Sequence, residues 1–189
     1  MNVTLVPLLA AGGLVTLAAA LIWVGVTYNR LVRQRNQTAA SWAQIDVQLK
    51  RRHDLIPNLV ETVKGYASHE RATLESVIDA RNGAMTAGAV AERAEAENLL
   101  TQALGQLFAL AEGYPDLKAN QNFAGLQREL AATEDKIAYA RQFYNSAVQT
   151  LTNTIQSVPS NLVAGMFGFR PPDYFETAGD QRGPVRVRF

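Results

Sequence analysis

The sequence predicts an all-α protein in which an N-terminal transmembrane helix continues into an elongated antiparallel bundle of three to four long helices. Three observations predict this fold class. An uncharged apolar run opens the chain, apolar residues then recur at intervals of three and four, and nothing before residue 170 has the alternation of a strand. Because the stretches between the periodic segments are short, consecutive helices should lie antiparallel.

The predicted anchor is the run from Leu8 to Val26, which only Thr16 interrupts. At about 1.5 Å per residue this run spans roughly 29 Å, close to the hydrocarbon thickness of a bilayer. A cleaved signal peptide is the alternative, but the run has no basic start, no Ala-x-Ala cleavage site stands directly before Tyr28, and the run continues into a helical pattern. The anchor residues are Leu8, Leu14, Leu17, Leu21, Trp23 and Val26.

Orientation follows from the cations beside the run. Arg30, Arg33 and Arg35 follow it closely, and no Lys or Arg precedes Leu8. The positive-inside rule therefore predicts a cytoplasmic bundle and an N-terminus outside the cell. The small residues Gly12, Thr16 and Ala20 recur at four-residue spacing, a pattern that lets two anchors pack closely.

Three regions are expected: residues 1–28 as tail and anchor, 29–169 as the bundle, and 170–189 as an extended C-terminal tail. In the bundle, Pro57 should kink or restart the first helix because it lacks a backbone N–H. The helices that should follow cover 59–82, 89–111 and 123–158, with reversals at 83–88 and 113–122 and a short helix after Pro159.

Composition points away from several kinds of chemistry. The chain has 189 residues, a net charge of +1 and no cysteine, so nothing global suggests nucleic acid, and thiolate ligands are excluded. His53 and His69 stand too far apart for a metal-binding pair on one helix. We interpret the acidic groups as solvated helix faces: Glu92, Glu95, Glu97, Glu129, Glu134 and Asp135. The sequence thus predicts no catalytic site, cofactor, metal or small-molecule substrate.

The turn before Pro57 is the candidate interaction site. Arg52 continues the apolar spacing of Ile45 and Leu49 and should point towards the bundle. Its guanidinium either pairs inside, with Asp54, carbonyls freed at the proline or an acid of a neighbouring helix, or reaches solvent from the end of the stripe. The candidate residues are Trp42, Asp46, Arg52, Asp54, Pro57 and Asn58.

The C-terminal tail offers a second candidate contact. Val185, Val187 and Phe189 alternate with two arginines, a period-2 pattern suited to adding a strand to a partner's sheet edge. Alternatively, Tyr174 and Phe175 pin the tail across its own bundle.

Several segments resemble the LemA family. They are residues 28–32, the stretch from Ala40 to Val63 with its Ile-Pro-Asn-Leu-Val run after Trp42 and Asp46, residues 120–141, and the Tyr-Phe pair at 174–175 with the terminal Phe. The resemblance covers nearly the whole chain. It implies an N-terminal membrane helix, an all-helical bundle and no particular reaction.

Two functional hypotheses follow. The first is a non-enzymatic, single-pass membrane scaffold whose bundle binds a membrane protein or another copy of itself. The second is an extracytoplasmic sensory module that holds a small ligand between its helices. The side of the membrane on which the bundle lies distinguishes them.

Overall fold

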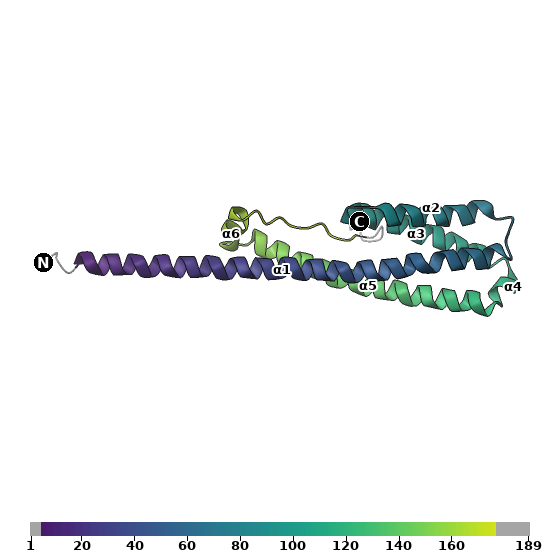
Figure 1. Ribbon diagram of the computed structural model, residues 1–189, viewed down its shortest axis with the longest axis horizontal. Coiled ribbons are helices and arrows are strands. Elements are labelled where there is room, and N and C mark those ends of the chain that lie inside the picture. Colours follow the sequence, from purple (N-terminus) through teal and green to yellow (C-terminus); the bar gives the residue numbers. More distant parts are fainter. Residues whose placement is uncertain (1–4, 177–189) are drawn as a thin grey trace, which may run out of the picture. The chain divides into compact units, whose positions relative to one another are not determined.

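The structure is a computed structural model that describes the backbone of residues 5–176 and the side chains of residues 12–176. Within that range all regular structure is helical (Figure 1). The helices are α1 (Leu5–Lys64), α2 (Arg71–Thr86), α3 (Val90–Ala111), α4 (Pro115–Lys118), α5 (Gln121–Gln156) and α6 (Ser160–Met166). The all-α class and the long apolar N-terminal helix are confirmed. The number of bundled helices and their antiparallel order stay predictions.

The contacts divide the chain into two compact units, each built from segments distant in sequence. Unit 1 contains α1 as far as Ala40 together with Ser146–Pro172. Unit 2 contains Ser41–Asn145 and the segment that starts at Asp173. This division by contacts does not test the three regions predicted from the sequence, 1–28, 29–169 and 170–189, which therefore stay predictions.

Unit 1 has a small apolar core where α6 packs on α1 and the end of α5. Leu31, Leu151, Val163 and Ala164 are buried there, and Val24 packs against them. The rings of Phe167 and Phe169 add to this packing, since both contact the ring of Tyr28. Burial of these side chains holds the short helix α6 in place, because seven residues cannot maintain a helix in water by themselves.

Unit 2 has the larger core, to which each of its helices contributes buried side chains. Helices α2 and α3 lie side by side (Figure 1). Representative core residues are Ile56, Leu59 and Val63 of α1, Val77 of α2, Leu100 and Leu107 of α3, Leu117 of α4, and Phe123 and Leu130 of α5. Asn120 caps the start of α5, where its Oδ1 accepts hydrogen bonds from the backbone N–H groups of Asn122 and Phe123.

The expected restart of the helix at Pro57 is wrong, because α1 runs through the proline as far as Lys64. A proline inside a helix leaves the carbonyl four residues earlier without its N–H partner, and here that carbonyl belongs to His53. Arg81 of α2 supplies the missing donor, since its Nε donates to the His53 carbonyl oxygen at 2.7 Å. A side chain from another helix therefore allows the proline in α1.

Other expected boundaries also move. The first connection between helices lies between Lys64 and Arg71, so Leu59 and Val63 belong to α1 and do not begin a new helix. The connection expected at 83–88 is shorter and lies at 87–89, and α4 occupies part of the connection expected at 113–122. Two apolar residues within the helices expected at 89–111 and 123–158 are exposed, Leu99 at 55% and Val158 at 81%.

Candidate functional site

The apolar part of α1 presents its side chains outward. Leu14, Leu17, Leu21 and Val26 are each more than half exposed, and Trp23 is 39% exposed. Among the described residues this is the one helix long and apolar enough to cross a membrane. The side chain of Leu8 lies outside the described residues, and Arg30, Arg33 and Arg35 are all exposed. An apolar helix surface that is exposed over most of the run from Leu14 to Val26 supports membrane association.

Arg52 lies inside unit 2, where it is 2% exposed. Its Nη1 donates to Glu97 Oε2 of α3 at 3.1 Å, and its Nη2 donates to Thr101 Oγ1 at 2.7 Å. Its Nε lies 2.8 Å from Glu134 Oε1 of α5, as an ion pair without hydrogen-bond geometry. Arg52 of α1 thus joins α1, α3 and α5, and its partners include the acids on neighbouring helices that the sequence left as one alternative.

His53 completes this group, which we call the polar cluster: Arg52, His53, Glu97, Thr101 and Glu134. His53 is 7% exposed, and its Nε2 lies 2.7 Å from Glu97 Oε1. Glu97 therefore has a partner on each carboxylate oxygen. Buried charges are tolerated only when they are paired and hydrogen-bonded, and the cluster meets this requirement at Glu97.

Glu134 is the member of the polar cluster with a perturbed pKa. Burial raises the pKa of its carboxyl, Arg52 opposes this rise, and the negative charges of Glu97 and Asp135 add to it. Its side chain is 41% exposed, so water reaches it as well. The cluster therefore contains one fully enclosed carboxylate and a second at its edge that takes up a proton more readily than an ordinary glutamate.

The interpretation of Glu97 as part of a solvated face is wrong, because Glu97 is 4% exposed. Glu134 keeps contact with water at the edge of the polar cluster. The position of Glu97 carried a signal, because it falls on the same stripe of α3 as the buried residues Ala94, Leu100 and Leu104. An acid on an apolar stripe, with an arginine on the apolar stripe of another helix, indicates a buried pair.

A second group of contacts surrounds Trp42, and we call it the aromatic clamp: Trp42, Tyr144 and Phe175. The Trp42 ring centroid lies 5.3 Å from that of Tyr144 and 5.6 Å from that of Phe175. The guanidinium of Arg93 lies over Trp42, and Arg93 also forms an ion pair with Asp46. Two of the predicted interaction residues, Trp42 and Asp46, thus serve contacts inside unit 2.

Hydrogen bonds fix the segment that carries Phe175. The Asn145 side chain donates to the Phe175 carbonyl oxygen at 3.1 Å and accepts from the Phe175 N–H at 2.9 Å. The Tyr144 hydroxyl donates to the Asp173 carbonyl oxygen at 2.9 Å, and burial with the charge of Asp173 raises its pKa. Phe175 is 2% exposed, whereas Tyr174 is 38% exposed.

The other predicted site residues have separate places. Asp54 is exposed and is not among the observed partners of Arg52, and Pro57 lies within α1. Asn58 is exposed, and its carbonyl accepts a hydrogen bond from Thr62. Val185, Val187 and Phe189 lie outside the described residues. No group of three or more His, Cys, Asp or Glu within the described residues has the arrangement of a metal site.

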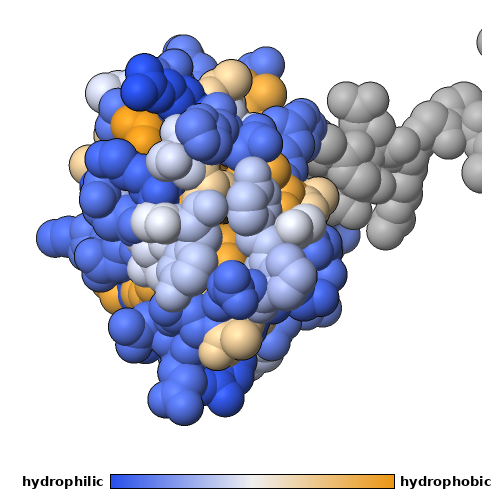
Figure 2. Space-filling model, turned by 90° about the vertical axis from the view of Figure 1, so that its right-hand side faces the viewer, coloured by the Kyte–Doolittle hydropathy of each residue, from blue (hydrophilic) through white to orange (hydrophobic). Residues whose placement is uncertain are grey.

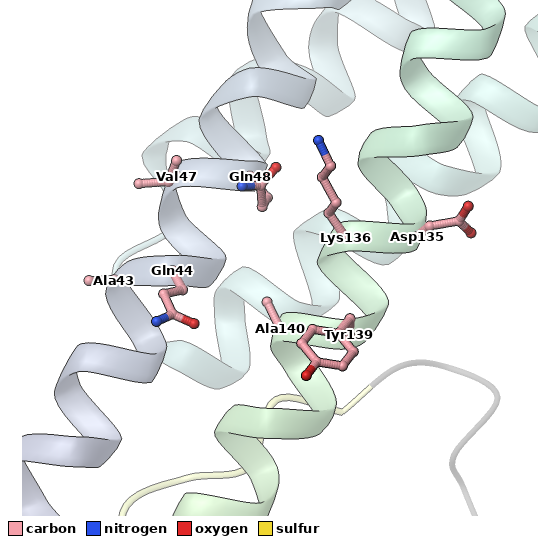
Figure 3. Close-up of a pocket in the computed structure, with 8 residues that line it drawn as sticks. All are labelled: Ala43, Gln44, Val47, Gln48, Asp135, Lys136, Tyr139 and Ala140. Atoms are coloured by element: carbon pink, nitrogen blue, oxygen red, sulfur yellow. The ribbon is translucent and has the colours of Figure 1, made fainter.

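Unit 2 has an open groove between α1 and α5, of about 630 Å³. Figure 3 shows Gln44, Gln48 and Ala140 directed into the gap between the two helices, with Val47 and Asp135 on its outer sides. Val47 is 63% exposed and Tyr139 is 74% exposed. The side-chain oxygen of Gln48 is buried without a hydrogen-bond partner. The lining of the groove therefore combines apolar side chains with the amides of Gln44 and Gln48.

The end of unit 2 seen in Figure 2 is largely hydrophilic, with small separate apolar spots. A surface of this kind is typical of a domain in water. It differs from the exposed apolar side of α1 in unit 1.

The chain matches the sequence profile of the LemA family over residues 41–189. It is 28% identical over 181 residues to magnetosome protein MamQ 2 of Paramagnetospirillum magneticum, and this alignment covers 81% of this chain and 66% of that protein. Magnetosome protein MamQ of Magnetospirillum gryphiswaldense is 26% identical over 203 residues, 93% of this chain and 75% of that protein. Protein LemA of Metamycoplasma hominis is 25% identical over 137 residues, 72% of this chain and 63% of that protein.

Proposed function

The chain belongs to the LemA family, and on this premise we propose that it is a single-pass membrane scaffold without catalytic activity. One anchor holds an antiparallel bundle of three to four helices in the cytoplasm, with the N-terminus outside. There the bundle binds a membrane protein or a second copy of this chain. The proposal assigns no cofactor, nucleic acid or small-molecule substrate.

The observation that carries the proposal is the change of surface along α1. Four anchor side chains between Leu14 and Val26 are more than half exposed, and the same helix then supplies core residues such as Ile56 and Leu59 to unit 2. A helix of this kind fits a lipid environment at one end and a folded helical unit at the other. Arg30, Arg33 and Arg35 support the cytoplasmic side for the bundle.

The groove between α1 and α5 is the surface we assign to the protein partner. Exposed Val47 and Tyr139 supply apolar area at its edge, and Gln44 and Gln48 add polar side chains between the two helices. Tyrosine is enriched among the residues that contribute most to binding between proteins. The polar cluster and the aromatic clamp hold unit 2 together and are not the binding surface itself.

Photocrosslinking tests this assignment in native membranes. A photoreactive amino acid replaces Val47 or Tyr139, and replaces Met85 of α2 as the control, because Met85 is also exposed, at 51%. Adducts at Val47 and Tyr139 without adducts at Met85 support the groove, and their mass separates a second copy from a different protein. Equal adducts at all three positions, or none at the groove, would contradict it.

The sensory alternative needs the bundle outside the cell and a ligand cavity between its helices. Two hollows in the described part of unit 2, of about 630 and 700 Å³, open on the surface. Their position fits a protein partner better than an enclosed small ligand. The two hypotheses also place the bundle on opposite sides of the membrane.

A further inference from the structure

Helix α6 and the residues before and after it expose an apolar face. Val158 is 81% exposed, Leu162 is 67%, Met166 is 73% and Phe167 is 50%. Leu162 and Met166 share one side of α6 because they stand four residues apart on it, and Val158 and Phe167 are the exposed apolar residues just outside its two ends. The other side of α6 is apolar as well, and there Val163 and Ala164 are buried. A helix that is apolar on both sides fits a place between protein and lipid.

The position of α6 in unit 1 indicates which layer of the bilayer it lies next to. Its buried side packs on Leu31 and Val24 of α1, and Val24 belongs to the apolar run that ends at Val26. The ring centroid of Phe167 lies 4.8 Å from that of Tyr28, and Tyr28 stands two residues after the end of the apolar run. Helix α6 therefore lies beside the part of α1 where the span leaves the hydrocarbon layer.

The charges of unit 1 fit an anionic bilayer surface. The segments 1–40 and 146–172 contain Arg30, Arg33, Arg35 and Arg170 and neither Asp nor Glu. The remaining segments contain 14 basic and 17 acidic residues, because 18 basic and 17 acidic residues make up the whole chain. Arginines near the surface attract anionic headgroups, and here no acidic side chain of unit 1 opposes them.

Two of these arginines already lie against parts of the same surface. Arg30 lines a groove of about 300 Å³ together with Asn153 of α5 and Ser160 of α6. The guanidinium of Arg35 lies 5.5 Å from the ring centroid of Phe169, which packs against the core of unit 1. Arg30 therefore lies close to the first residue of α6, and Arg35 lies close to the segment that follows the helix.

We propose that α6, with Val158 and Phe167, is a second membrane contact that enters the interfacial layer of the bilayer crossed by α1. Its exposed apolar side chains lie at the level of the upper acyl chains, and the four arginines contact anionic headgroups. This inference rests on the proposed membrane anchor. The contact would fix unit 1 against the bilayer surface, which a single span does not do by itself.

Fluorescence quenching tests this in full-length protein reconstituted in vesicles of phosphatidylcholine and phosphatidylglycerol. Since the chain has no cysteine, single Leu162→Cys and Met166→Cys variants carry an environment-sensitive fluorophore. A nitroxide placed high on the acyl chain should quench both, by about twofold, as expected for interfacial side chains. A Met85→Cys variant, labelled on α2, should not be quenched. In phosphatidylcholine alone the quenching should weaken, and equal quenching would overturn the role of the arginines.

A labelled Leu17→Cys variant separates the two proposals, because a nitroxide deep in the acyl chains should quench it if the anchor spans the bilayer. Quenching at Leu17 with none at Leu162 and Met166 overturns the α6 contact and leaves the anchor. No quenching at Leu17 overturns the anchor itself. The double variant Leu162→Ser/Met166→Ser should abolish shallow quenching at a labelled Val158→Cys site without lowering the melting temperature, and unchanged quenching would contradict the proposal.

Discussion

Replacing Arg52 with Met should destabilise unit 2 far more than replacing its neighbour Arg51 with Met. The guanidinium of Arg52 contacts Glu97, Thr101 and Glu134, so the Met variant leaves Glu97 enclosed without its main countercharge. Breaking a buried ion pair by removing one partner costs about 3–5 kcal/mol. Arg51 pairs at the surface with Glu129, and both side chains are about half exposed. Pairs of that kind contribute roughly 0–1 kcal/mol.

The melting temperature of full-length protein in detergent, followed by tryptophan fluorescence, measures this difference. For a chain of this size a change of 1 kcal/mol shifts the melting temperature by roughly 2–4 °C. Arg52→Met should thus lower it by about 6–20 °C and Arg51→Met by less than about 4 °C. The double variant Arg52→Met/Glu97→Leu should recover much of the loss, because it removes both buried charges. Equal shifts for Arg52→Met and Arg51→Met would refute the role assigned to the polar cluster.

Other predictions concern single contacts. Because the pKa of Glu134 is raised in the folded state, its contribution to stability is present at acid pH and is lost as pH rises through that pKa. In denaturation curves measured at several pH values, the free energy of unfolding of Glu134→Gln should therefore fall less steeply above pH ~4.5 than that of the original protein. The same steepness in both proteins would contradict this prediction. Arg81→Met should lower the free energy of unfolding by about 1–3 kcal/mol, because it leaves the His53 carbonyl without a hydrogen-bond donor. The loss should be far smaller in a Pro57→Ala background, where the N–H of residue 57 again donates to that carbonyl. If the losses of the two single variants simply add in the double variant, Arg81 does not compensate for the proline. Phe175→Ala should lower the free energy of unfolding by about 3 kcal/mol or more and make the segment around residue 175 easier to cleave. Asn145→Ala should have the same two effects more weakly. Limited proteolysis of the two variants measures the difference.

The seam of α5 was predictable because its apolar residues repeat over ten turns, so that burial and periodicity agree. Leu130, Ile137, Tyr144 and Leu151 are all buried as their spacing predicts. Val158 continues the same spacing but lies beyond the end of the helix, where periodicity no longer determines burial.

The passage of α1 through Pro57 was not predictable from local preference. The decisive contact is the hydrogen bond from Arg81 to the His53 carbonyl, which joins positions on different helices. The burial of Glu97 likewise depends on Arg52 and His53 of α1. A single sequence shows which residues lie on a helix stripe, but the pairing of charges across helices requires the tertiary arrangement.

The side of the membrane on which unit 2 lies tests the central claim most directly. Gly88 is exposed in the connection between α2 and α3, and a Cβ added there would meet no atom within 4 Å, so a Gly88→Cys variant should fold normally. A membrane-impermeant maleimide should label this cysteine only after the cells are permeabilised, because the proposed orientation places the bundle in the cytoplasm. Labelling of intact cells would place the bundle outside, contradict the scaffold orientation and favour the sensory alternative.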